Sequence, residues 1–273
     1  MTTVPPSELY HYTTGDGPPL LLVNAAYQTA DSWKTVVNSL RNDFTVIAVD
    51  LPNQGKSPVA AQLQTVADYG SALCEFLRYK KLQPNALTCL GLSLGADILL
   101  DLRYNRGIEF RCMLTCGATP TGIDAYVMQH VNVQLECLRD YGVTAMARVM
   151  LQKAFSPHFY AQYPAMTNFV VRHIKTTFEH RPQALEALLL ATRPNPLTRR
   201  RVDSGLGHLT FVQGTEDLLY PLSLYENYGP DLGIEITPVK GGHAYAMERP
   251  KEACQLIRSA YAASGHRPLD DRS

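Results

Sequence analysis

Short apolar runs alternate with amphipathic stretches along most of the chain. Runs rich in leucine, valine and isoleucine predict buried strands, and apolar positions at helical spacing between them predict helices packed on a core. The predicted strands span residues 9–13, 20–24, 44–50, 87–90, 111–117, 208–213 and 234–239. The predicted helices between and after them span residues 31–40, 65–79 and 244–262. This alternation indicates an α/β fold with a mainly parallel central sheet and helices on both faces.

The alternation stops between residues 120 and 202, where successive helices are predicted instead. Their apolar stripes are Tyr126, Val127, His130, Val131, Leu135 and Leu138, and then Ala184, Leu185, Leu188 and Leu189. Such stripes either pack neighbouring helices together or line a tunnel for an acyl chain. We therefore predict a core formed by residues 1–119 and 203–264, an inserted all-helical cap over 120–202, and a mobile polar tail over 265–273.

The segment Gly91-Leu-Ser-Leu-Gly95 has the pattern of a nucleophile elbow, a tight turn between a strand and a helix that presents a serine. The turn forces Ser93 into a strained, left-handed backbone conformation, and the flanking glycines avoid collisions there. It also presents the Leu94 N–H, at the start of the helix, to negative charge that develops on a substrate oxygen. The alternative is a glycine-flanked serine in an ordinary strand-to-helix connection.

A serine hydroxyl is hardly ionised at neutral pH, so it needs a base that accepts its proton during attack. His243 is the candidate base, because it follows two glycines at the end of the last predicted strand. Asp217 follows the preceding strand and is the candidate acid that fixes the tautomer of the imidazole. Glu216 is the closest alternative for the acid, and Asp124, where the predicted cap begins, is a weaker one.

The order Ser93, Asp217, His243, each after its own predicted strand, resembles that of the α/β-hydrolase fold superfamily. The resemblance covers nearly the whole chain. It includes the segment Asp50-Leu-Pro-Asn-Gln-Gly-Lys-Ser57 and the segment Gly242-His-Ala-Tyr-Ala-Met-Glu-Arg-Pro250. It implies an α/β-hydrolase fold with a serine nucleophile.

In this superfamily a backbone N–H after an early strand supplies the second donor to the oxyanion. That stretch usually reads His-Gly, whereas this chain has Asn24-Ala25. The resemblance therefore assigns the two oxyanion donors to the N–H groups of Ala26 and Leu94. A backbone donor tolerates a changed side chain. The neighbouring Tyr27 is a candidate contact for a substrate or a carrier.

A looser resemblance is to the hydroxyacyl transferases that make the hydroxyalkanoyloxy-alkanoate precursor of rhamnolipids. It rests on Val-Asn-Ala-Ala continued by Thr-Ala-Asp-Ser-Trp33, on Asp50-Leu-Pro52, and on an all-helical cap of similar length. Those transferases tend to carry tryptophan after the nucleophile, where this chain has Leu94. The departure concerns the substrate and leaves the mechanism unchanged.

The expected reaction is attack by Ser93 on an ester or thioester carbonyl, followed by release of the acyl group to water or to a hydroxyl acceptor. We expect a hydrolase, an esterase or thioesterase, with a hydroxyacyl transferase as the alternative. A non-catalytic receptor for a small ligand is the alternative from another class of protein. A serine-dependent carbon–carbon bond hydrolase and a perhydrolase also stay open.

Net charge, the length of the apolar runs and the cysteine spacing indicate which partners, location and cofactors to expect. Lysine plus arginine and aspartate plus glutamate each number 25, so net charge gives no reason to expect nucleic acid. No apolar run is long enough to span a bilayer and no leader pattern is present, so we expect a cytoplasmic protein without membrane insertion. The six cysteines lack the spacing of a disulfide framework or zinc site. With no phosphate-binding loop either, we expect no cofactor and no metal.

The densest basic run is Arg199, Arg200 and Arg201. A solvated surface cluster at the end of the cap is its ordinary interpretation. The alternative is that these residues dock an acidic acyl carrier protein or bind a substrate carboxylate.

Overall fold

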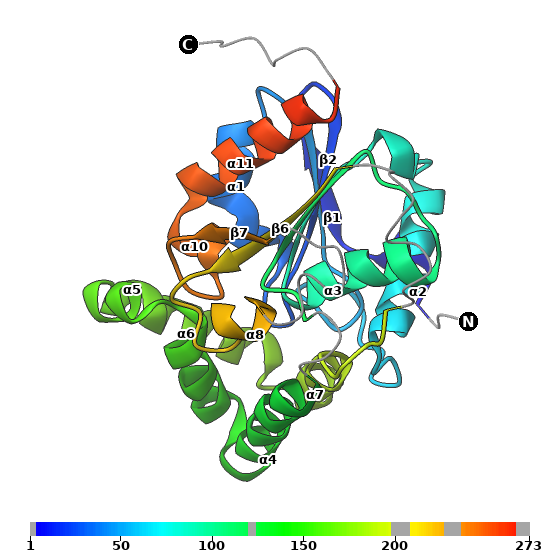
Figure 1. Cartoon of the computed structure of the whole chain (residues 1–273). Helices are drawn as coiled ribbons and strands as arrows, with labels where there is room; N and C mark the ends of the chain where they lie inside the picture. Colours follow the sequence, from blue (N-terminus) through cyan, green and yellow to red (C-terminus); the bar gives the residue numbers. More distant parts are fainter. Residues whose placement is uncertain (1–3, 120–123, 198–207, 227–235, 266–273) are drawn as a thin grey trace.

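The computed structural model describes residues 4–119, 124–197, 208–226 and 236–265. Within these ranges, seven strands form one sheet in the order β1-β3-β2-β4-β5-β6-β7 (Figure 1). The strands are β1 (His11–Thr14), β2 (Pro19–Val23), β3 (Thr45–Val49), β4 (Thr88–Leu92), β5 (Cys112–Cys116), β6 (His208–Gly214) and β7 (Ile236–Val239). Strand β1 is antiparallel to β3, and the other neighbours are parallel.

All seven predicted strands are therefore present, with ends displaced by at most two residues. For the last strand, the comparison starts at residue 236, because residues 234 and 235 lie outside the described part of the chain. The predicted mainly parallel sheet is confirmed.

Helices cover both faces of the sheet. The α-helices are α1 (Lys34–Leu40), α2 (Val66–Tyr79), α3 (Leu94–Leu100), α4 (Asp124–Ala154), α5 (Pro157–Gln162), α6 (Pro164–Phe178), α7 (Pro182–Ala191), α8 (Leu222–Glu226), α10 (Tyr245–Glu248) and α11 (Pro250–Ala263). Short 3-10 helices are η1 (Pro6–Glu8), η2 (Ala30–Trp33) and η3 (Pro84–Ala86), and η4 (Asp101–Asn105) is a π-helical turn after α3.

Alternation along β2 shows how the two layers form. Leu20 and Leu22 belong to the apolar cluster that contains α1 and α11 side chains, whereas Leu21 and Val23 belong to the cluster on the α2 and α3 side. Successive side chains of a strand point to opposite faces, so a run that is apolar throughout is buried on both. Central strand β4 is buried at every position for the same reason.

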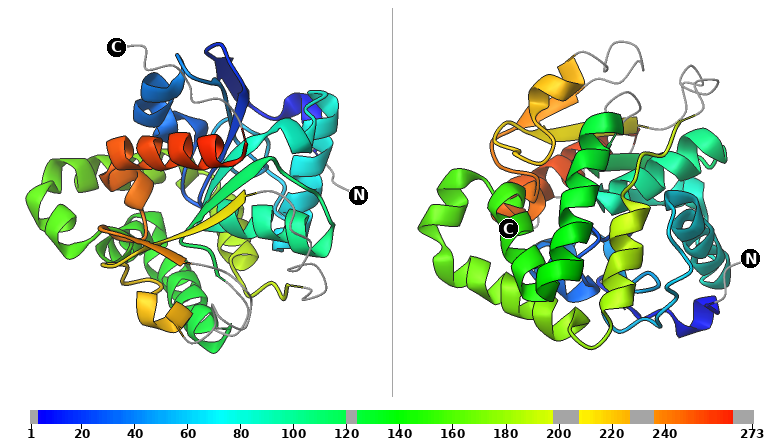
Figure 2. Two further views of the ribbon diagram at one scale, coloured as in Figure 1. Left: turned by 45° about the horizontal axis from the view of Figure 1, so that its top comes forward. Right: turned by 90° about the horizontal axis from the view of Figure 1, so that it is seen from below.

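The four helices α4 to α7 lie between β5 and β6 in the chain and form one end of the molecule in Figure 1. The right view of Figure 2 shows the same helices from below. Gly142, with φ 79° and ψ 179°, breaks α4 into two helical segments. The predicted cap boundaries at residues 120 and 202 lie outside the described residues and stay predictions, as does the mobile tail, which is described only to residue 265.

The segment predicted as the closing helix, residues 244–262 with its effective start near Pro250, forms two helices. It breaks at Arg249, with φ −133° and ψ 61°, and α11 starts at Pro250. Proline has no N–H to donate and clashes with a helical conformation of the residue before it, so the chain cannot continue one helix through this point.

The parallel strands bring three candidate residues to one edge of the sheet. Ser93 follows β4, Asp217 lies in the turn after β6, and His243 follows β7. Strands that run the same way end at the same edge, which is where open α/β sheets bind ligands. Segments far apart in sequence therefore meet there.

Candidate active site

Ser93 lies in the tight turn between β4 and α3, with φ 51° and ψ −119°. The flanking glycines are required. A Cβ at Gly91 would lie 2.6 Å from the carbonyl oxygen of Gly95, and a Cβ at Gly95 would lie 2.3 Å from that of Val23. The Ser93 N–H donates to the Cys116 carbonyl at the end of β5 (2.8 Å), which fixes the turn to the neighbouring strand. The strained geometry expected of a nucleophile elbow is thus present.

His243 Nδ1 donates to Asp217 Oδ2 at 2.9 Å. An ionised carboxylate can only accept, so this contact places the proton on Nδ1 and leaves Nε2 able to accept one. The side chains of His243 and Asp217 are 7% and 0% exposed. Exclusion of water strengthens the pair, since less solvent screens it.

Three further donors hold the Asp217 carboxylate in place. The N–H groups of Leu219 and Tyr220 donate to Oδ1, each at 2.8 Å, and Gln213 Nε2 donates to Oδ2 at 2.8 Å. The carboxylate therefore has one orientation from which it can orient the imidazole. Glu216, the alternative acid, is only partly buried, and it is Asp217 that contacts His243.

The imidazole of His243 lies against the turn that follows β5. A Cβ at Gly117, where φ is +60°, would lie 2.7 Å from Cε1 and 2.8 Å from Nδ1 of His243. The Tyr220 ring packs edge-on against the imidazole, with 5.1 Å between ring centroids. Only glycine leaves space at residue 117, so this residue sets the position of the ring.

The two candidate oxyanion donors belong to Leu94 and Ala26. Leu94 is the first residue of α3, and an N–H at that position has no acceptor within its helix. Ala26 follows β2, and among the described residues its N–H has no acceptor in the protein. The turn around it is fixed by the Gln28 N–H, which donates to the Ala25 carbonyl at 3.1 Å. Ala26 and Ser93 line the same cavity.

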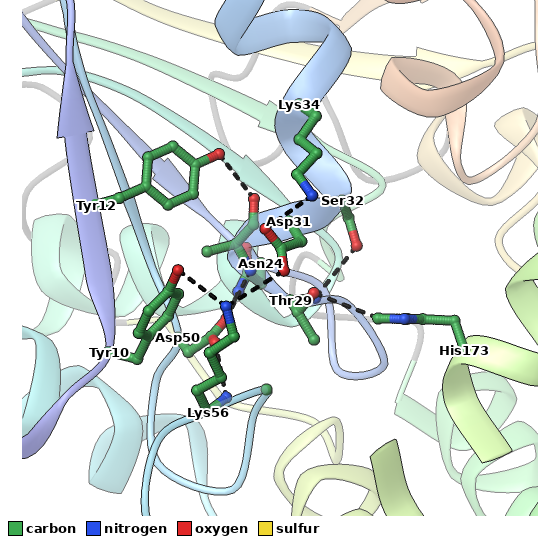
Figure 3. A network of polar contacts seen from close by, with 12 residues as sticks. Tyr10, Tyr12, Asn24, Thr29, Asp31, Ser32, Lys34, Asp50, Lys56 and His173 are labelled. Atoms are coloured by element: carbon green, nitrogen blue, oxygen red, sulfur yellow. Dashed lines mark hydrogen bonds and ion pairs between the residues drawn. The ribbon is translucent and has the colours of Figure 1, made fainter. Parts of the chain in front are cut away.

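Asn24, in place of the usual histidine, is fully buried beneath this turn (Figure 3). Its Oδ1 accepts from Trp33 Nε1 at 2.7 Å, and its Nδ2 donates to the Val49 carbonyl at 2.9 Å and lies 3.3 Å from Asp50 Oδ1. Burial raises the pKa of Asp50, and donation from the backbone N–H groups of Lys56 and Ala30 opposes that shift. Asn24 therefore anchors the end of β2 to β3 without itself facing the cavity.

A cavity of about 430 Å³ lies over Ser93 and His243, and mostly apolar side chains line it. Those of the cap are Met150, Leu151, Ala154, Phe155, Phe159, Met166, Phe169, Val170 and Ile174. Gln134 of α4 lies within the span of the first predicted stripe, without belonging to it, and lines the cavity. The other lining residues of the cap come from segments outside the two predicted stripes. No described member of the two stripes lines the cavity, and all but His130 lie in the buried cluster or against it, which favours the packing interpretation.

Tyr27 lines the cavity and its hydroxyl donates to Gln134 Oε1 on α4. Burial raises the pKa of Tyr27 well above its ordinary value, so the phenol stays protonated. Its role as a contact for a substrate or a carrier stays a prediction. Arg199, Arg200 and Arg201 lie outside the described residues, and Asp124 is the first residue of α4.

Sequence reasoning missed Gln213, which orients Asp217, and Gly117, which sets the imidazole. It also missed Asp97 on α3, whose carboxylate accepts from the N–H and hydroxyl of Thr119. A glycine directly after a buried strand is the one local signal that could have pointed to Gly117. Gln213 reaches Asp217 through the turn after β6, and Asp97 on α3 reaches Thr119 in the segment after β5; neither contact has a sequence motif.

Within the described ranges, no group of three or more histidine, cysteine, aspartate or glutamate side chains is placed to hold a metal ion. The six cysteines are unpaired, five of them buried. No helix in the described part of the chain combines the length and apolar character needed to cross a bilayer.

The profile of the Alpha/beta hydrolase family matches residues 20–256. The pimeloyl-[acyl-carrier protein] methyl ester esterase of Vibrio vulnificus strain YJ016 is 24% identical over 269 residues, 93% of this chain and 98% of that protein. An esterase from Thermogutta terrifontis has a TM-score of 0.80 at 19% identity and covers 94% of each chain. The enol-lactonase from Burkholderia xenovorans LB400 has a TM-score of 0.77 at 16% identity, covering 93% of this chain and 96% of its own. The chain belongs to the alpha/beta hydrolase family.

Proposed function

We propose that this protein is a serine-dependent ester hydrolase that forms an acyl-enzyme on Ser93 from an acyl ester or thioester. The observation that carries the proposal is the buried His243–Asp217 hydrogen bond of 2.9 Å beside the cavity that Ser93 also lines. Esterases among the relatives support the ester as the bond that is cleaved.

In the proposed mechanism, Ser93 Oγ attacks the carbonyl carbon while His243 Nε2 accepts its proton. Asp217 stabilises the imidazolium that results. The N–H groups of Leu94 and Ala26 donate to the oxyanion, whose charge develops only during the reaction. Collapse of this intermediate expels the alcohol or thiol, which takes the proton from His243. Water, activated by the same base, then releases the carboxylic acid.

The apolar wall formed by α4 and α6 supports an acyl chain as the part of the substrate that occupies the cavity. Transfer to a hydroxyl acceptor instead of water would use the same intermediate. Because the relative from Vibrio vulnificus is named for a substrate linked to acyl carrier protein, such a carrier is the proposed macromolecular partner. The cytoplasmic location expected from the sequence stays a prediction.

Intact-mass measurement after incubation with a fluorophosphonate and with a panel of acyl esters and thioesters tests the proposal. We expect one covalent adduct, located on Ser93, and none in the Ser93→Ala protein. Acid release without added alcohol identifies a hydrolase, and a new ester formed with a 3-hydroxy acid identifies a transferase. A folded protein that takes no label and turns over no ester is a ligand receptor, which would contradict the proposal.

A further inference from the structure

A second cavity, of about 450 Å³, adjoins the first, and Asp31 and His173 line both. It lies between η2, the loop that follows β3, and the carboxyl-terminal half of α6. Of the described residues that line it, all but Gly55 carry a polar or charged side chain. Charged residues are therefore more frequent among its lining residues than among those over Ser93.

Helix α6 forms a wall of both cavities. Its first half contributes Met166 and Phe169 to the acyl cavity, and its second half contributes Thr176 and Thr177 to the polar one. His173 lies at the transition, and its Nε2 is 3.3 Å from Thr29 Oγ1 (Figure 3). A ligand that followed this helix would pass from apolar to polar surroundings within a few turns.

Arg181, just after α6, brings a cation to the polar cavity without a carboxylate partner. Its guanidinium donates to backbone carbonyls only, those of Thr177 (2.7 Å), Ser57 (3.5 Å) and Gly55. Within the described ranges no acidic side chain forms an ion pair with it. Burial lowers the pKa of Arg181, and only the charge of Asp50 opposes that shift.

The neighbouring cations also exceed the carboxylates available to them. Lys34 and Lys56 share the single carboxylate of Asp31, at 3.3 Å and 3.6 Å (Figure 3). Lys56 Nζ also donates to the Tyr10 hydroxyl at 3.0 Å. Asp50 is buried and already accepts from backbone N–H groups at 2.6 Å and 2.9 Å. Counting Lys34, which lines the first cavity, three cations thus lie near the two carboxylates Asp31 and Asp50.

We propose that the polar cavity binds an anionic group, a carboxylate or a phosphate, on the ester whose acyl chain occupies the cavity over Ser93. Lys56 and Arg181 supply the charge, and His173, His180 and the threonine hydroxyls supply further donors. Guanidinium and ammonium groups among hydroxyls suit either anion. The inference rests on the proposed function and adds to it that the substrate is an amphiphile charged at the end remote from the reacting ester.

Matched pairs of p-nitrophenyl esters test this site. One member of each pair is the half-ester of a dicarboxylic acid, the other the ester of a monocarboxylic acid of equal length, and a second arm replaces the carboxylate with a phosphate. We expect Lys56→Met and Arg181→Met each to lower the charged-to-neutral ratio of kcat/KM by about tenfold, mainly through KM. Preference within the two charged arms identifies the anion. Lys175→Met, on the same helix but outside the cavity, is the control and leaves the ratio unchanged.

The Lys56 side chain is 59% exposed, so its replacement leaves the packing intact even if Arg181→Met does not fold. If the charged-to-neutral ratio of kcat/KM is the same in Lys56→Met as in the wild type, for the carboxylate and the phosphate substrates alike, the anion site is overturned. The proposed ester hydrolysis is not affected by that result. Wild-type protein that hydrolyses no member of any pair contradicts the proposed function instead. In that case calorimetric titration of Ser93→Ala with monocarboxylates, alkyl phosphates and uncharged alkyl alcohols of equal length still tests the site, and equal affinities for charged and uncharged ligands overturn it.

Discussion

Asp97 accepts two hydrogen bonds from Thr119, one from its backbone N–H at 2.6 Å and one from its hydroxyl at 2.9 Å. Asp97 lies on α3, the helix that follows the candidate nucleophile, and Thr119 lies two residues beyond Gly117, which touches the imidazole. The pair therefore ties the helix behind Ser93 to the turn that positions His243. Both residues are buried.

This buried carboxyl makes stability depend on pH. Burial raises the pKa of Asp97 to about 7, and the bonds from Thr119 and the charge of His243 only partly oppose it. The folded protein thus holds this proton more tightly than the unfolded chain. Stability from this group is fully present at low pH and is lost as pH rises towards 7. We expect its contribution to fall by about 3 kcal/mol between about pH 5 and about pH 8.

Urea denaturation of wild type and Asp97→Asn across that range measures the effect. Asparagine can still accept from Thr119 but does not titrate, so subtracting the two free energies of unfolding removes the contributions of Asp50 and other shared groups. The wild type should lose stability relative to the variant as pH rises. Two parallel curves would show that Asp97 does not titrate in this way.

Asp217→Asn tests the role of the buried acid. The amide can donate to the imidazole, which favours the wrong tautomer, so we expect kcat for an ester substrate to fall by about 10³ to 10⁴. Glu216→Gln is the matched control, since the adjacent carboxylate does not contact His243, and it should keep kcat within about twofold. Equal losses in the two variants, measured by steady-state hydrolysis, would remove the assignment to Asp217.

Alanine substitutions at Gly117 and Gly142 distinguish the effect of backbone strain from the effect of displacing the imidazole of His243. Gly117→Ala places a methyl group 2.7 Å from His243 Cε1, whereas Gly142→Ala, also at positive φ, meets nothing within 4 Å. Each variant should lose about 1 kcal/mol of stability from strain. Only Gly117→Ala should also lose activity, by about a hundredfold, because a misplaced base transfers protons poorly.

Thermal unfolding and ester hydrolysis, measured side by side, provide the two readouts. Retained activity in Gly117→Ala would mean that the imidazole has room to move and that the turn after β5 does not set its position.

The catalytic candidates could be predicted because each is encoded locally. The glycines around Ser93 mark a turn that few sequences need, and Asp217 and His243 each follow a recognisable strand. The residues that hold them could not be predicted. Gln213 reaches Asp217 because of the turn that follows β6, and Gly117 reaches His243 because β5 and β7 lie on the two sides of β6. The first relationship depends on the shape of a turn and the second on strand order, and hydrophobic periodicity contains neither.

The residues that line the cavity could not be predicted from the sequence for a different reason. Apolar residues at helical spacing predict that a helix has a buried face, but not whether that face meets another helix or an empty cavity. Val127, Val131 and Leu188 are buried in the packed cluster without lining the cavity, whereas Ile174 of α6 belongs to the same cluster and also lines the cavity. The cap helices that line the acyl cavity therefore could not be distinguished from those that only pack against others before the fold was known.

Val170→Trp tests whether α6 bounds the acyl chain. Val170 lines the cavity, and a larger ring there would fill part of its volume of about 430 Å³. Long acyl chains should then be excluded while short ones still reach Ser93, because hydrophobic pockets discriminate mainly by size. We expect kcat/KM for p-nitrophenyl decanoate to fall by at least about tenfold with that for the acetate nearly unchanged. Val133→Trp, at a position on α4 that is 44% exposed and away from the cavity, is the control. A uniform loss across chain lengths would place the acyl chain elsewhere, since a blocked cavity must penalise the longer substrates more.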